Sequence, residues 1–299
     1  TGIQGLGLAS VAYQNAVAFA RERLQGRSLG GARHPEKPAD PIIVHPDVRR
    51  MLLTAKAFVE GARALAVHTA LQIDIERHHP DPAQRERAGH WVALMTPIIK
   101  AYFTDMGFEA TSLAMQVHGG AGYIVDTGVE QFMRDARIAK IYEGTNGIQA
   151  LDLVGRKLTA ANGETIKSFF DEVGQLLAAC EGDEGMQPFT GPLADATERL
   201  KQTTGEVYQR MAADPLEAGA ASVDYLDLFA LTAMAWAWTG QVRAARVAHA
   251  EGRIGDDFLR AKTETARFFV QRMLPDTLGL AAKITAGAAP LMNLEEGDF

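Results

Sequence analysis

Apolar side chains recur at three- and four-residue intervals along most of the chain, the spacing of helices that bury one face. The clearest stripe follows Pro46, a residue suited to the first position of a helix, and runs to about His78. The sequence His79-Pro-Asp-Pro82 then interrupts it. No segment before residue 118 alternates between apolar and polar positions over a useful length. The pattern predicts an antiparallel helix bundle.

Breaks rich in glycine and proline divide the rest of the chain into further predicted helices. In the first part, helices are expected at 1–25, 46–78, 83–106 with a kink at Pro97, from 107 to about 118, and at 150–160, with a loop at 27–45. In the second part they are expected at 164–180, 191–212, 222–250, 255–273 and 276–286. The fold class is therefore all-α, with residues 1–162 as one domain and 163–299 as a helical extension.

Small residues are frequent at the start of the first predicted helix, namely Gly2, Gly5, Gly7, Ala9 and Ser10. They lie among larger apolar residues at helical spacing, namely Ile3, Leu6, Val11, Val17 and Phe19. Small side chains let another backbone approach closely, or leave room for a ligand. The sequence leaves both interpretations open.

Charge and cysteine content restrict the class of protein. Lys and Arg number 30 and Asp and Glu 37, a net charge of −7 that gives no reason to expect nucleic acid or an anionic membrane as partner. The most apolar segment, residues 228–238, is too short to span a bilayer. Its Trp236 and Trp238 are expected to pack on the first domain or on a partner subunit. The single cysteine, Cys180, fits a reducing compartment, so we expect a cytoplasmic protein.

Metal and nucleophile chemistry have little support in the sequence. No ligand cluster is formed by four histidines, His78, His79, His90 and His118, so no metal site is expected. His118 is expected to cap or pack at the glycine-rich turn that follows it. Glu181 and Glu184 should raise the pKa of the Cys180 thiol, and no serine has the context of a nucleophile elbow.

Two further motifs have plain structural interpretations. The glycine-rich segment 119–122 lacks the preceding strand of a dinucleotide fingerprint and could be a simple turn between helices. Its amides could still receive an anion, with Gln116 one turn away. The charged segment Arg134-Asp-Ala-Arg137 is expected to form ion pairs that fix a helix rather than to act directly in catalysis.

One carboxylate stands in an apolar stretch. Glu143 lies between Tyr142 and Gly144, with Ile141 just before. Aromatic and aliphatic neighbours disfavour the charged form, so the pKa of Glu143 should rise toward the working pH, where a general base is most effective. Glu143 is the first candidate for chemistry.

Together these residues resemble the acyl-CoA dehydrogenase family. The resemblance rests on Gln116-Val-His-Gly-Gly-Ala-Gly-Tyr, Arg134-Asp-Ala-Arg-Ile138, Ile141-Tyr-Glu-Gly-Thr145 and, in the first helix, Arg21-Glu-Arg-Leu-Gln-Gly-Arg27. It covers roughly residues 1–160 and implies that family's C-terminal four-helix bundle. The longer loop after the first helix and the helical tail resemble the large bacterial branch of the family.

The resemblance implies an FAD-dependent oxidation of an acyl-CoA to the trans-2-enoyl-CoA. Glu143 matches the base that takes the α-proton, and its backbone N–H would polarise the thioester. Tyr142 and Gly144, on either side, are expected to contact the substrate. The resemblance also assigns FAD contacts: Arg23 and Gln25 to the diphosphate and Gln116 and Gly120 to the adenosine side, all across a dimer, and Thr145 and Gly147 beside the base.

The same resemblance implies a homodimer or higher homo-oligomer and an electron acceptor such as electron-transfer flavoprotein. The chain begins at Thr1 without Met or a signal peptide and looks truncated, since the family's N-terminal helical domain and middle β-domain have no counterpart in it. We therefore expect this chain alone to hold FAD poorly and to be inactive, and the pKa of Glu143 to rise only when those domains cover it. Two alternatives stay open: an acyl-CoA oxidase or alkylation-response flavoprotein of the same fold, and a purely structural module for oligomerisation.

Overall fold

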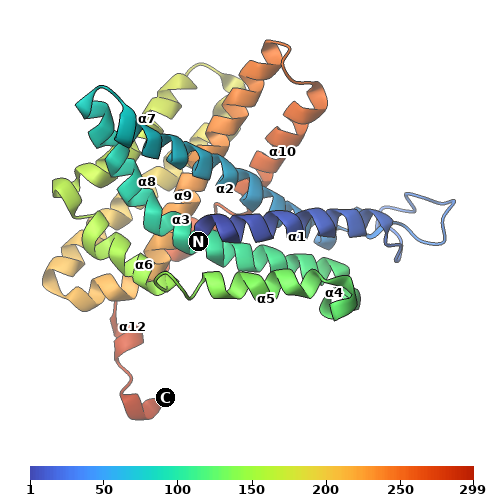
Figure 1. Ribbon diagram of the computed structural model, residues 1–299, viewed down its shortest axis with the longest axis horizontal. Helices are drawn as coiled ribbons and strands as arrows, with labels where there is room; N and C mark the ends of the chain where they lie inside the picture. The colour runs from blue at the N-terminus through green and yellow to red at the C-terminus, as the bar shows by residue number, and fades with distance from the viewer. The chain divides into compact units, whose positions relative to one another are not determined.

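The computed structural model describes residues 1–299 and contains helices without strands (Figure 1). The first six are α1 (Gly2–Glu22), α2 (Pro46–His78), α3 (Pro82–His118), α4 (Gly120–Tyr123), α5 (Val129–Ala139) and α6 (Asn146–Asp152). The tail contains α7 (Glu164–Ala179), α8 (Gln187–Ala213), α9 (Pro215–Ala250), α10 (Asp256–Arg272), α11 (Asp276–Thr285) and α12 (Ala289–Met292). The prediction of an all-α fold is confirmed.

Short helical turns connect these helices. They are 3₁₀ turns at Ile42–Val44, Val125–Thr127, Ala160–Gly163, Glu184–Met186 and Glu296–Asp298, and a π turn at Leu153–Lys157. The one β feature is an isolated antiparallel bridge between Leu24 and Pro41. No helix combines the length and apolarity needed to cross a membrane.

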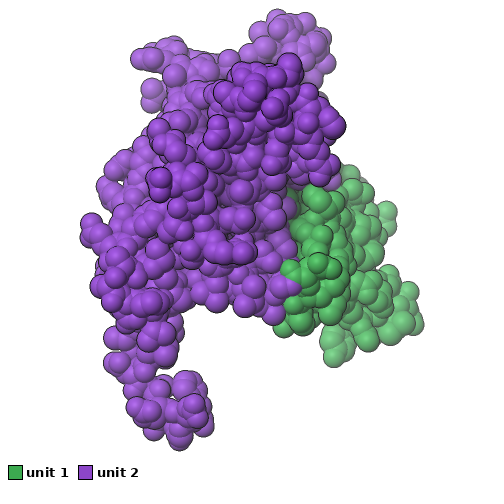
Figure 2. Space-filling view, turned by 60° about the vertical axis from the view of Figure 1, so that its left-hand side comes forward, with its two compact units in different colours: residues 1–60, 103–143 green, residues 61–102, 144–299 purple.

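The chain divides into two compact units (Figure 2). Unit 1 contains residues 1–60 and 103–143, and unit 2 contains residues 61–102 and 144–299, so α2 and α3 each contribute to both. These compact units are not the two predicted domains, so the domain boundary near residue 162 stays a prediction.

Unit 1 is a four-helix bundle of α1, the start of α2, the end of α3 and α5. In Figure 1, α5 (green) runs beside α1 (blue). Its core joins three of the helices and the turn at Ile42–Val44, through Ala12, Ala16, Ala20, Ile42, Met51, Leu52, Ala114 and Val117. Phe132 of α5 packs against that core. Alanines of α1 and larger apolar residues of α2 and α3 therefore meet in a common interior.

Helix α1 packs through its small residues. Gly5, Ala9, Ala12, Ala16 and Ala20 are buried at intervals of three and four, whereas the larger Ile3 and Val11 are exposed. A Cβ added to Gly5 would lie 2.5 Å from the carbonyl oxygen of Phe103 in α3. Close approach of another backbone is thus what the structure shows at Gly5.

The predicted break at Gly107 is wrong, because α3 continues through it to His118. A Cβ on Gly107 would lie 2.7 Å from the carbonyl oxygen of Gly5, so this glycine serves the contact between α1 and α3. Helix α9 also starts earlier than predicted, at Pro215, because the Asp214 carboxylate accepts a hydrogen bond from the Leu216 N–H at 2.9 Å. The predicted α2, in contrast, matches its observed bounds.

Unit 2 is built around α9, which packs against α8, α10 and α11 and buries Tyr225, Phe229 and Trp238 completely. The Trp236 ring lies 4.9 Å from His68 of α2 and 5.0 Å from Trp91 of α3, measured between centroids. A Cβ on Gly61 would meet the Trp238 indole nitrogen at 2.6 Å. Both tryptophans therefore pack on helices from the first predicted domain, as expected.

Candidate active site

A cavity of about 720 Å³ lies within unit 1. It is lined by the end of α1, the segment after that helix, the start of α2 and the turn between α3 and α4. Four of the predicted cofactor residues, Arg23, Gln25, Gln116 and Gly120, are among its lining. The structure therefore brings together residues that stand about ninety positions apart in the sequence. The volume is in the range of small-molecule sites, roughly 300–1,000 Å³.

The first wall of the cavity is an extended segment after α1. Arg23 leaves the helix with φ −66° and ψ 119°, and its carbonyl accepts a hydrogen bond from the Ile42 N–H at 2.8 Å. The bridge between Leu24 and Pro41 continues the pairing. Side chains alternate along extended backbone, so Arg23 and Gln25 project to the same side. Both are exposed side chains that line the cavity.

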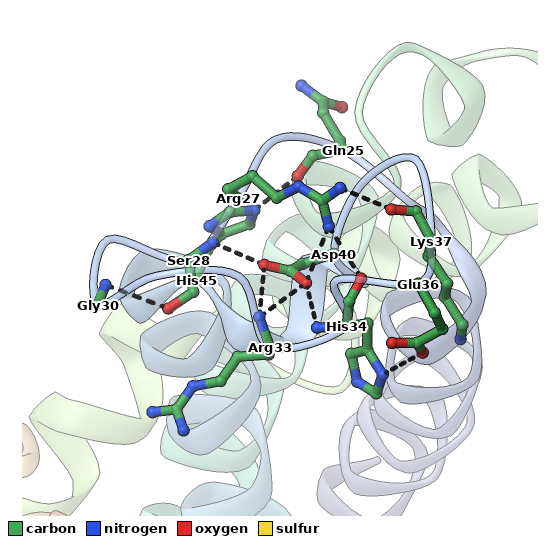
Figure 3. Close-up of polar contacts among 10 residues, drawn as sticks. All are labelled: Gln25, Arg27, Ser28, Gly30, Arg33, His34, Glu36, Lys37, Asp40 and His45. Atoms are coloured by element: carbon green, nitrogen blue, oxygen red, sulfur yellow. Dashed lines mark hydrogen bonds and ion pairs between the residues drawn. The ribbon is translucent and has the colours of Figure 1, made fainter.

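The loop from Arg27 to Asp40 supports this segment (Figure 3). The Asp40 side chain is fully buried and accepts backbone hydrogen bonds from Ser28 at 2.9 Å, Arg33 at 3.0 Å and His34 at 2.8 Å. The Ser28 amide, together with those of His34 and Arg33, lowers the pKa of Asp40 to about 2. The sequence predicted a loop here but contains no sign of this carboxylate's role, because nothing local distinguishes Asp40 from a solvated acid.

The second wall is the turn from α3 into α4. Gly119 has φ +59°, a conformation that favours glycine, and a Cβ on Gly122 would lie 2.6 Å from the Met115 carbonyl oxygen. A Cβ on Gly120 would meet nothing within 4 Å, so this residue faces open space. The segment is thus a turn between helices that leaves one of its glycines accessible.

Two histidines line the cavity besides the predicted residues. His118 is buried, donates from Nδ1 to the Ala114 carbonyl at 2.7 Å and stacks on Phe19 with 4.4 Å between ring centroids. Its expected packing role is confirmed, but its place in the cavity was missed. His45 bonds through Nε2 to the Gln25 carbonyl at 2.8 Å. In the sequence, His45 is marked only by its position directly before Pro46, and that position does not indicate a place in a cavity.

The lining fits an anionic group joined to a ring system. Arg23 offers a forked cationic donor suited to phosphate, and Gln25, Gln116 and the glycine amides add neutral donors. Phe19, Ile42 and Met51 supply an apolar wall. Asp47 is the one carboxylate in the lining. This donor set is consistent with the adenosine diphosphate part of FAD.

The Glu143 segment has an unusual backbone. Glu143 and Gly144 both adopt positive φ, +58° and +80°, and Thr145 then caps α6 by accepting from the Ile148 N–H at 3.4 Å. A non-glycine residue in this left-handed region costs about 1 kcal/mol or more. The Glu143 side chain is exposed, as are Ile141 and Tyr142. The Tyr142 hydroxyl donates to the Gln4 side-chain carbonyl.

The start of α6 is anchored within unit 2. Lys100 is buried and donates from Nζ to the Asn146 side-chain oxygen at 2.7 Å, while the Asn146 amide donates to the Ala101 carbonyl at 3.2 Å. Thr145 and Gly147, the other two predicted cofactor residues, flank this asparagine and are exposed. The anchor was missed because a lone lysine in an apolar helix has no sequence signal for its partner.

The remaining candidates have structural roles. Arg134 lies 3.8 Å from Glu130 one turn earlier on α5, and Asp135 accepts from Gln131 at 2.7 Å. The pKa of Cys180 is raised, as predicted, but by burial first and then by Asp183, not by Glu181 and Glu184. Neither site contains an arrangement for catalysis.

Comparison with known proteins agrees with this geometry. The family described as "Acyl-CoA dehydrogenase, C-terminal domain" matches residues 1–158, and "Acetyl-CoA dehydrogenase C-terminal like" matches residues 169–295. The chain therefore belongs to the acyl-CoA dehydrogenase family. The four-helix bundle of unit 1 lies within the residues that match the family's C-terminal domain.

The relatives are specific enzymes of this family. The chain is 39% identical to the 3-methylmercaptopropionyl-CoA dehydrogenase of Ruegeria pomeroyi over 290 residues, which cover 95% of this chain and 48% of the relative. The chain spans about half the length of the curated relatives it matches.

Solved structures show the same fold. An acyl-CoA dehydrogenase from Bacillus anthracis complexed with FAD matches with a TM-score of 0.73 and 18% identity, covering 99% of this chain and 48% of that one. Caenorhabditis elegans ACDH-11 in complex with C11-CoA matches with a TM-score of 0.70 and 16% identity, covering 91% and 42%.

Proposed function

We propose that this chain is the C-terminal, base-bearing part of an FAD-dependent acyl-CoA dehydrogenase. The observation that carries the proposal is the convergence of Arg23, Gln25, Gln116 and Gly120 on one cavity. Family membership, the FAD complex of the Bacillus anthracis structure and the C11-CoA complex of ACDH-11 support it. The complete enzyme, in this proposal, is this chain joined to the family's N-terminal and middle domains.

Each residue has a defined task in this proposal. The Arg23 guanidinium and the Gln25 amide bind the cofactor diphosphate, and Gln116 and the Gly120 backbone bind its adenosine side. Thr145 and Gly147 contact the cofactor beside the base, and Tyr142 and Gly144 contact the substrate. When bound, FAD supplies the acceptor for the β-hydride.

Glu143 is the proposed general base. Its carboxylate removes the proton from the carbon next to the thioester carbonyl, and its backbone N–H donates to the thioester oxygen as negative charge develops there. The side chains that flank it in sequence, Ile138, Ile141, Tyr142 and Ile148, are exposed apolar groups. An acyl chain and the other domains of the complete enzyme would cover these groups and exclude water from the base.

The wider assignments belong to the same proposal. The complete enzyme works as a homodimer or higher homo-oligomer and passes electrons to an acceptor such as electron-transfer flavoprotein. The free, buried Cys180 is consistent with a reducing compartment, the cytoplasm. The first family match ends at residue 158 and the second begins at residue 169, which supports a domain boundary near residue 162.

The decisive experiment is Glu143→Gln in the complete enzyme, assayed with a panel of acyl-CoA substrates. Loss of a general base should lower kcat by about 100- to 10,000-fold, with FAD still bound. The control is Glu109→Gln, the same chemical change at an exposed position of α3, which should leave kcat unchanged. Retained turnover with bound flavin would move the base elsewhere. Dehydrogenase activity of the 299-residue chain without other polypeptides would contradict its assignment as one part of the enzyme.

Two alternatives are separated by further measurements. An oxidase of the same fold would consume oxygen in step with substrate, whereas a dehydrogenase would require an added electron acceptor. A purely structural module is favoured by the exposure of Glu143 in this chain. It would bind no FAD in the complete protein, and Glu143→Gln would change only assembly, if anything.

A further inference from the structure

We propose that Asp40 is a positioning residue for the cofactor diphosphate, and that its buried carboxylate holds Arg23 and Gln25 toward the cavity by ordering the loop between Arg27 and Lys37. The inference rests on the proposed function, because it concerns how the same cavity receives FAD. Asp40 does not line the cavity. It would therefore act through Arg23 and Gln25, not by touching the ligand.

The loop has no hydrophobic core that could order it. Every residue from Gln25 to Ala39 is exposed or half-exposed, and its largest apolar side chain, Leu29, is 90% exposed. Asp40 is the first buried residue after α1. An exposed segment of this length loses much conformational entropy when it adopts one shape, so its order must come from polar contacts.

The Asp40 side chain supplies those contacts. Figure 3 shows the carboxylate at the centre of the loop, with dashed lines to the backbone of Ser28, Arg33 and His34. The Arg27 guanidinium lies 3.5 Å from the same carboxylate and donates to the carbonyls of His34 at 3.0 Å and Lys37 at 2.6 Å. Charged acceptors make stronger hydrogen bonds than neutral ones, so one side chain fixes both halves of the loop.

The Asp40 backbone connects the ordered loop to the cavity wall. Its carbonyl accepts from the Gln25 N–H at 3.0 Å, and its N–H donates to the Gly26 carbonyl at 2.9 Å. Ile42, two residues later, donates to the Arg23 carbonyl at 2.8 Å. Backbone hydrogen bonds of Asp40 itself, and of Ile42 two residues later, thus connect the Asp40 side chain to the segment that contains Arg23 and Gln25.

The test uses Asp40→Asn in the complete enzyme. The substituted amide would place N–H donors against the backbone N–H groups that now meet a carboxylate. We expect FAD affinity, measured by flavin fluorescence on titration of the apoenzyme, to fall about tenfold, whereas kcat at saturating FAD stays within about twofold. The control Glu36→Gln makes the same change at an exposed carboxylate of the same loop and should leave FAD affinity unchanged.

A second readout separates positioning from a general effect on folding. In a protein that already carries both Arg23→Ala and Gln25→Ala, Asp40→Asn should weaken FAD binding by less than about threefold, because the two residues through which it acts have been removed. If Asp40→Asn fails to fold, the milder Arg27→Gln, at a 40% exposed side chain, decides instead. It should weaken FAD binding about threefold in the parent and not measurably in the Arg23→Ala/Gln25→Ala protein.

Each outcome has a distinct meaning. Wild-type FAD affinity in Asp40→Asn, or a tenfold loss that persists in full in the Arg23→Ala/Gln25→Ala background, would overturn the inference. If instead the unmodified enzyme binds no FAD, or Arg23→Ala has no effect on binding, the proposed function itself has failed.

Discussion

The contact between α1 and α3 allows a prediction whose sign depends on two neighbouring glycines. Gly5→Ala and Gly7→Ala make the same change two residues apart in one helix. In helix interiors alanine is more favourable than glycine by about 1 kcal/mol. Packing decides whether that gain is realised, and it differs sharply between the two positions.

At Gly5 an added Cβ would lie 2.5 Å from the Phe103 carbonyl oxygen and 3.0 Å from the Thr104 Cα, where ordinary contacts begin at 3.4 Å. The opposing atoms are helix backbone, so relief requires a shift of a whole helix, and overpacking of this kind costs about 1–3 kcal/mol. A contact of 2.5 Å calls for the upper part of that range, about 2–3 kcal/mol, so we expect Gly5→Ala to destabilise by about 1–2 kcal/mol once the helix gain of about 1 kcal/mol is subtracted. At Gly7 nothing lies within 4 Å, so the substitution should stabilise by about 0.5–1 kcal/mol.

Thermal unfolding followed by circular dichroism measures both variants. For a protein of this size about 1 kcal/mol shifts Tm by about 3 °C, so Tm should fall by about 3–6 °C in Gly5→Ala and rise by about 2 °C in Gly7→Ala. Equal shifts of the same sign in the two variants would refute the argument, because they would mean that helix propensity and not the contact with α3 controls both positions.

Three further perturbations test contacts of unit 2. Asn146→Ala removes an acceptor from the buried Lys100 ammonium and should reduce the free energy of unfolding, measured by urea titration, by about 2–3 kcal/mol. The control Asn15→Ala, at an exposed position, should cost less than about 0.5 kcal/mol. Equal losses in the two variants would exclude a special role for the Lys100–Asn146 pair. Thr69→Val leaves the buried Trp91 N–H without its 3.1 Å acceptor and should cost about 1–3 kcal/mol in the same assay, whereas the exposed Thr96→Val should cost little. Burial lowers the pKa of His68, so the unfolded chain binds more protons than the folded one, and the free energy of unfolding should decline as the pH falls below about 6.5. His68→Phe should flatten that decline. An unchanged pH profile of unfolding in this variant would show that His68 does not cause it.

Local start and stop signals explain why the exact bounds of some helices could be predicted from the sequence. Pro46 at the start of α2 and the His79-Pro80 pair at its end act through their own backbone restrictions, which sequence displays directly. Gly107 is the opposite case. A glycine weakens a helix locally, but here its missing side chain is required by α1, about a hundred residues away, and that contact has no local signature.

The same distinction applies to the candidate site. Arg23, Gln25, Gln116 and Gly120 could be proposed because they stand in motifs whose order and spacing resemble a family, and the structure places them around one cavity. Asp40 and His45 could not, because their contacts depend on how the loop after α1 folds back on the end of that helix. Lys100 was also invisible, since its partner Asn146 is 46 residues away.

The positive φ of Glu143 has a consequence for directed evolution. Glycine, asparagine and aspartate tolerate the left-handed region better than glutamate, so replacing Glu143 by glycine should relieve about 1 kcal/mol of backbone strain. A library selected only for heat resistance would therefore be drawn to glycine or asparagine at this position, and would collect stable proteins that lack the carboxylate. Selection of this protein for thermostability should therefore keep Glu143 unchanged, or measure turnover of each selected variant in parallel.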